Sequence, residues 1–117
     1  MKTTTFFALS ALVPASLVAC GGYAAPNEHM AQTEAAAGAA VGANAKDSPQ
    51  AALHLKLADE EVARAKALMA DGDNQRAEFT LIRAKADAEL ALALAKENAA
   101  KVDAQQAEEQ IKALENQ

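Results

Sequence analysis

The sequence is poor in the residues that usually build binding and redox sites. Among its 117 residues it has no tryptophan, one tyrosine, three phenylalanines and one cysteine. A single cysteine cannot form an internal disulfide, and neither His29 nor His54 has a second histidine or cysteine at the spacing of a zinc site. The near absence of Trp and Tyr removes the usual platforms for sugars and apolar ligands. We therefore expect no metal ion and no cofactor.

Catalytic motifs are missing as well, and the charge is acidic. No glycine-rich phosphate loop is present, and no serine or cysteine stands with a base in a nucleophile motif. Asp and Glu number 16 against 11 Lys and Arg. An acidic surface repels the phosphates of nucleic acids and anionic headgroups. The sequence thus predicts a protein that is not an enzyme and does not bind nucleic acid.

The amino terminus has the three parts of a secretory signal. Lys2 gives a positive start, an apolar stretch follows, and small residues end it, so we expect a signal peptide over residues 1–19. The residues at its end resemble the lipobox of bacterial lipoproteins: Leu17, Val18, Ala19 and Cys20.

The lipobox resemblance implies a lipid anchor. It implies cleavage before Cys20, diacylglycerol on the thiol and acylation of the new amino terminus. Several acyl chains hold a protein stably in a bilayer. Gly21 stands where an Asp tends to retain such proteins in the inner membrane, so the resemblance implies the periplasmic face of the outer membrane.

Two other interpretations of this segment remain open. One is a transmembrane helix, although Thr3 to Thr5 and Pro14 leave less than the ~20 apolar residues needed. The other is an ordinary signal peptide cut near Tyr23, Ala24 and Ala25, which would put Pro26 directly after the cut.

Residues 20–47 are rich in alanine and glycine and have no sustained apolar stripe. Small side chains bury too little surface to offset a backbone ordering cost of ~1–2 kcal/mol per residue. A short alanine-driven helix near Ala35 is the alternative, although Gly38 and Gly42 disfavour a stable one. We expect a flexible tether here.

Residues 48–117 are expected to form an all-α helical hairpin. Ser48 can cap a helix and Pro49 suits its first turn. That helix should end at Asp71 and Gly72, where glycine supplies a left-handed stop. Acidic residues at this turn suggest a calcium loop, but the required glycine and glutamate positions hold Arg76 and Ile82.

The second helix meets no Gly or Pro from Gln75 through Gln117. Its apolar residues recur every three or four positions, and beyond Glu97 they narrow to a coiled-coil pattern. The shorter first helix cannot cover this length, so we expect a partner, either a second copy or an envelope protein. The expected contact residues are Phe79, Ile82, Ala107, Ile111 and Leu114.

The helical region is also similar to a known family. Pro49, Gly72-Asp73, Arg83-Ala84 and the Ala and Leu alternation after them resemble the bacterial lipoproteins grouped as domain of unknown function 4398. The resemblance implies an outer-membrane or periplasmic helical hairpin, sometimes associated with peptidoglycan-binding envelope proteins, and supplies no catalytic residues. The predicted function is a lipid-anchored structural or adaptor module. The alternative is a periplasmic binding module for a cell-wall or small-molecule ligand.

Overall fold

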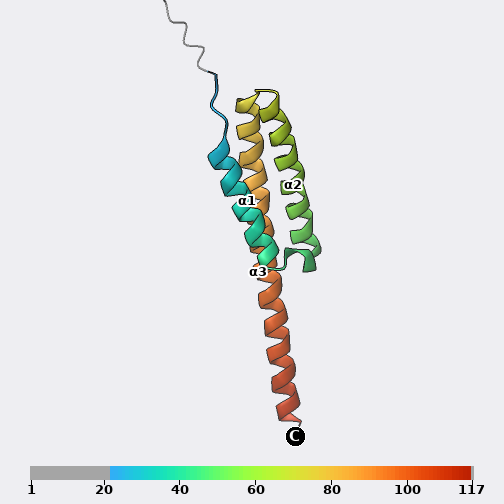
Figure 1. Cartoon of the computed structure of the whole chain (residues 1–117). Coiled ribbons are helices and arrows are strands. Elements are labelled where there is room, and N and C mark those ends of the chain that lie inside the picture. Colours follow the sequence, from blue (N-terminus) through green and yellow to red (C-terminus); the bar gives the residue numbers. More distant parts are fainter. Residues whose placement is uncertain (1–21, 117) are drawn as a thin grey trace, which may run out of the picture.

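The computed structural model describes residues 22–116, so the predicted signal, Cys20 and Gly21 lie outside the described residues. Four elements follow one another: α1 (Asn27–Gly42), the 3-10 turn η1 (Ala45–Asp47), α2 (Pro49–Ala70) and α3 (Asn74–Glu115). Figure 1 shows α1 and α2 on either side of the upper part of α3, which continues alone below them. The described chain is thus all-α, as predicted, with its long helix last.

The predicted hairpin between α2 and α3 is confirmed in its details. Ser48 accepts a 3.4 Å hydrogen bond from the amide of Ala51, and Pro49 opens α2. Gly72 has φ of 79°, and the amide of Asp73 donates to the carbonyl of Leu68 over 2.9 Å, which makes a Schellman stop. Asp73 then caps α3 through the amide of Arg76. Local turn chemistry therefore sets both ends of the turn.

Helix α1 corrects the prediction of a tether over residues 20–47. The segment is helical from Asn27 to Gly42 and packs on α3. Pro26, Met30, Thr33, Ala37 and Ala40 recur at steps of four and three, and each is buried or partly buried. Alanine lets helix backbones approach closely, so packing against α3 outweighs the low helix propensity of Gly38 and Gly42. What links Cys20 to the folded part is therefore short.

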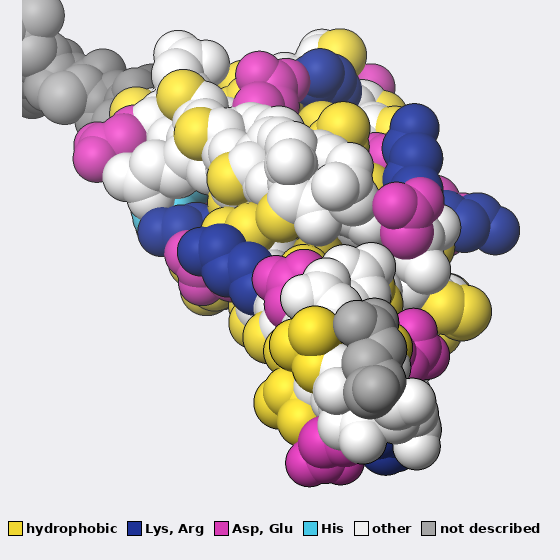
Figure 2. All heavy atoms as spheres, turned by 90° about the horizontal axis from the view of Figure 1, so that it is seen from below, with side chains coloured by type: hydrophobic (Ala, Val, Ile, Leu, Met, Phe, Trp, Pro, Cys, Tyr) yellow, Lys and Arg dark blue, Asp and Glu magenta, His cyan; other side chains and the backbone are white. Residues whose placement is uncertain are grey.

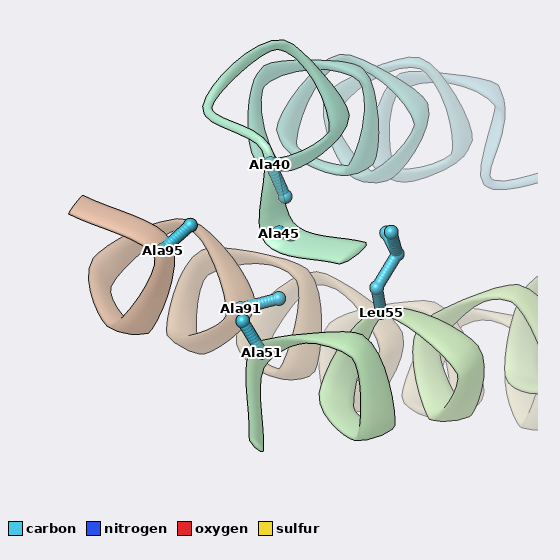
Figure 3. Packing of buried hydrophobic residues seen from close by; sticks show 6 residues of the cluster. All are labelled: Ala40, Ala45, Ala51, Leu55, Ala91 and Ala95. Carbon is cyan, nitrogen blue, oxygen red and sulfur yellow. The ribbon is translucent and has the colours of Figure 1, made fainter. Parts of the chain in front are cut away.

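The core consists mainly of alanine. At the lower end of the bundle one cluster draws a side chain from every element, as Figure 3 shows: Ala40, Ala45, Ala51, Leu55, Ala91 and Ala95. A second cluster near the hairpin turn holds Ala65, Ala77 and Leu81. The buried side of α3 therefore carries small residues over most of its contact with α1 and α2.

Helix α3 outlasts its neighbours. Its 42 residues span roughly 63 Å, against roughly 33 Å for the 22 residues of α2. Every described residue from Ala99 onward is exposed. Among the described residues, no helix is long and apolar enough to cross a membrane.

Candidate interaction surface

The predicted contact residues all lie exposed along α3. Phe79 is 60% exposed, Ile82 46%, Ile111 56% and Leu114 70%, and Ala107 is exposed as well. The structure therefore places none of them in the core. They fall into two groups, one beside the hairpin turn and one on the end of α3 that has no neighbour.

The first group, which we call the proximal patch, consists of Phe79, Ile82 and Leu90. These residues lie on the side of α3 turned away from Ala77, Ala84 and Ala91, which are fully buried. A helix turns 100° per residue, and the two sets are therefore about half a turn apart. The proximal patch is apolar surface left over after α1 and α2 have packed.

The second group, which we call the distal seam, continues the same side of α3 to its end. Its members follow at steps of four, three, four and three: Ala100, Ala104, Ala107, Ile111 and Leu114. Figure 2 looks along α3 from its C-terminal end and shows hydrophobic side chains at the surface beside acidic ones. Spacing of this kind is typical of a left-handed coiled coil, in which a second helix covers the apolar line.

Charged residues border the distal seam in a definite order. Lys96 and Lys101 come first, and Asp103, Glu108 and Glu115 follow toward the end of the helix. The Nζ atom of Lys101 lies 2.6 Å from Oε1 of Glu97 on the preceding turn. The ammonium group of Lys101, by hydrogen bond and by charge, lowers the pKa of the Glu97 carboxyl below its usual value. The seam thus runs from a basic stretch into an acidic one.

The two histidines brace the bundle, which their sequence context did not indicate. His29 Nε2 on α1 lies 3.3 Å from a Glu78 carboxylate oxygen, and His54 Nδ1 on α2 lies 2.7 Å from Asp87 Oδ1. Glu78 and Asp87 both belong to α3. Each histidine therefore ties one shorter helix to the long one. These two contacts depend on how the helices are aligned with one another. The spacing of residues within a single helix does not contain that information.

Surface hollows exist, but they are open. One of about 370 Å³ lies where the chain enters α1, between Tyr23, His29 and Glu78. Glu78, by hydrogen bond and charge, raises the pKa of the Tyr23 hydroxyl. Another lies beside Phe79 and is lined by Arg64, Arg76 and Arg83, the only arginines in the sequence.

Two of these three arginines already have carboxylate partners. Arg76 Nη1 lies 3.2 Å from Asp73, and Arg83 Nη2 lies 2.6 Å from Glu61. The charge of the arginine hollow is therefore largely neutralised by the chain itself.

Within residues 22–116, no group of three or more His, Cys, Asp and Glu side chains could hold a metal ion.

The comparisons with known proteins identify a family. No curated protein and no solved structure matches the chain. A family model described as a domain of unknown function, DUF4398, matches residues 28–115. The matched region includes α1 as well as the hairpin, and it ends with the last helical residue of α3. The chain therefore belongs to the DUF4398 family.

Proposed function

We propose that this protein is a non-enzymatic envelope lipoprotein, anchored by lipid on Cys20 to the periplasmic face of the outer membrane, which acts as a structural or adaptor module through helix association. The observation that carries the proposal is the distal seam: an apolar line with coiled-coil spacing on a part of α3 that neither α1 nor α2 covers. A helix end that only faces solvent needs no large apolar residues in line, whereas this one has Ile111 and Leu114.

The position of the chain entry supports the same function. Asn74, at the start of α3, donates a 2.7 Å hydrogen bond from its side chain to the carbonyl of Tyr23. Tyr23 is three residue steps along the chain from Cys20, and an extended chain of that length spans at most about 11 Å. A lipid on Cys20 would therefore lie near the hairpin turn, at the opposite end of α3 from the distal seam.

Separation of these two ends suits an adaptor. The anchored end and the docking end are about 60 Å apart along a continuous helix. Contacts from α1 and α2 stiffen the anchored half, while the other half offers its apolar line to a partner. The seam can thus be occupied without disturbing the anchored part.

The experiment is cross-linking in intact cells. A photoreactive residue at Ile111 is expected to give a covalent adduct, either with a second copy or with one envelope protein identified by mass. The control carries the same residue at Gln106, which lies on the other side of the helix. We expect Ile111→Asp with Leu114→Asp to abolish assembly, because two buried carboxylates oppose helix pairing, while export is unchanged. Equal adduct yields at both positions, or none at either, would contradict the proposal.

A further inference from the structure

We infer that the partner of the distal seam is a second copy of this chain, with the two α3 helices antiparallel and overlapping over residues 97–114. The inference deepens the proposed function and rests on it, since it names the partner for the same surface. Three features of the described chain carry it: the free side of the helix, the order of large and small residues along it, and the order of its charges.

The free side of α3 admits a second helix over this length. Ala91 and Ala95 face the rest of the bundle and are buried, whereas Glu97 and Ala100 are exposed. Residue 97 lies two positions beyond residue 95, a rotation of about 200°. A second copy on the distal seam therefore meets neither α1 nor α2, even where its end reaches Glu97.

Large and small residues are complementary in one antiparallel register. With the two-fold axis between Gln105 and Gln106, Ile111 lies opposite Ala100 of the second copy, and Ala104 lies opposite Ala107. Small residues let the helices approach, and the exposed Ile111 side chain fills the space beside the opposing alanine. Leu114 lies opposite the aliphatic part of Glu97, the one polar member of the line. Each large residue thus meets a smaller one or a flexible stem.

The charges favour the same register. Antiparallel helices pair flanking residues of the same kind, and this register places Lys101 beside Glu108 of the second copy, twice by symmetry. Sliding the copies by one heptad toward the bundle places Lys101 beside Lys101 of the second copy and Asp103 beside its Asp103. Sliding them by one heptad the other way places Glu108 beside Glu108 of the second copy. Of these three registers, only the first pairs opposite charges without opposing like ones.

A parallel pair in register is disfavoured by the same residues. In that orientation Lys96 faces Lys101 of the second copy, and Asp103 faces Glu108. Like charges at these flanking positions oppose association and select orientation. A single charge reversal therefore distinguishes the two orientations: Lys101→Glu should weaken an antiparallel dimer and strengthen a parallel one.

The overlap is short, which sets the expected strength. Eighteen residues of helix span about 27 Å, and the interface is smaller than the ~1,600 Å² typical of stable complexes. Association should therefore be concentration-dependent in solution. Confinement of two anchored copies to one membrane raises their effective concentration and strengthens the pair.

The test is a charge exchange measured by analytical ultracentrifugation of the full mature chain, purified from membranes in excess detergent. Lys101→Glu and Glu108→Lys should each raise the dimer dissociation constant about tenfold, because two attractive pairs become repulsive. The double variant should return to within about threefold of the original value. Lys96→Glu is the matched control: it changes the net charge as Lys101→Glu does, but lies outside the overlap of residues 97–114, and should leave dimerisation unchanged. Circular dichroism confirms that all four variants keep their helix content.

Three results would overturn the inference. One is a monomer at every concentration, another is a double variant as weak as the single ones, and the third is tighter dimerisation of Lys101→Glu, which a parallel pair predicts. A monomeric chain that still cross-links one foreign protein through Ile111 would overturn the second copy and leave the adaptor function standing. A chain that neither dimerises nor forms a cross-link through Ile111 would contradict the proposed function itself.

Discussion

At the scale of single residues, Thr33 joins α1 to α3. It is fully buried, and its hydroxyl lies 2.7 Å from the carbonyl oxygen of His29 and 3.2 Å from that of Leu81. One hydroxyl hydrogen serves both acceptors, which belong to different helices. In a core made mostly of alanine, this polar contact fixes the register of α1 on α3.

Replacement of Thr33 tests that contact. Thr33→Val keeps the shape and removes the hydroxyl, so we expect a loss of about 1 kcal/mol in the free energy of unfolding. Thr80→Val is the matched control, because within residues 22–116 the Thr80 hydroxyl donates only to the carbonyl of Arg76 on its own helix. Urea unfolding followed by circular dichroism measures both. Equal losses for the two variants would show that the contact with Leu81 contributes nothing.

At the scale of the elements, two glycines have opposite roles. Gly72 adopts φ of 79° at the end of α2, a conformation that costs other residues roughly 1–2 kcal/mol. Gly38 lies inside α1, exposed, and a Cβ built on it would meet no atom within 4 Å. The first glycine is required by the turn, whereas the second weakens its helix.

Alanine at each of these positions should therefore act in opposite directions. We expect Gly72→Ala to lower the midpoint of thermal unfolding and Gly38→Ala to raise it, with free-energy changes of about 1 kcal/mol and 0.5–1 kcal/mol. Differential scanning calorimetry provides the measurement. If Gly38→Ala destabilised the chain, α1 would not be the packed helix described above.

The elements also show what the sequence could and could not predict. The ends of α2 and the start of α3 were predictable, because Ser48, Gly72 and Asp73 act on their own neighbours along the chain. Helix α1 was not predicted, since its stability comes from alanine contacts with a helix some fifty residues away. The steps of four and three from Pro26 to Ala40 were present, but alanine occurs both on and off this line, so the buried side did not stand out as more hydrophobic. The distal contact residues Ala107, Ile111 and Leu114 followed from the length difference between the helices, whereas the contacts of His29 and His54 with α3 required the folded register.

At the scale of the whole molecule, the two ends of the bundle differ. Chain entry and the hairpin turn lie together, joined by the bond between Asn74 and Tyr23. The bare part of α3 leaves from the other end, as Figure 1 shows. Because α1 is folded, only the few residues between Cys20 and Asn27 separate the proposed anchor from the bundle. On the proposed function, the lipid would thus hold the bundle close to the membrane.

Removal of the proposed anchor has a direct test. Cys20→Ala should leave an uncut precursor that retains residues 1–19 and carries no acyl chains, because the lipobox pattern requires the thiol. Mass spectrometry of the membrane fraction measures the intact chain. Ala19→Ser keeps a small residue before the cut and serves as the control. A mature mass for Cys20→Ala would favour the ordinary signal peptide cut near Ala25.

The parallel course of α1 and α3 determines how the molecule would bear tension. The contacts of His29 with Glu78 and of Thr33 with Leu81, followed by the buried cluster that holds both Ala40 and Ala91, show that both helices run the same way. A pull between the proposed anchor and the distal end of α3 would slide α1 along α3, loading all these contacts together rather than one after another. The proposed antiparallel pair would repeat this shear geometry in both copies, so the folded bundles would transmit force between the two proposed lipid anchors.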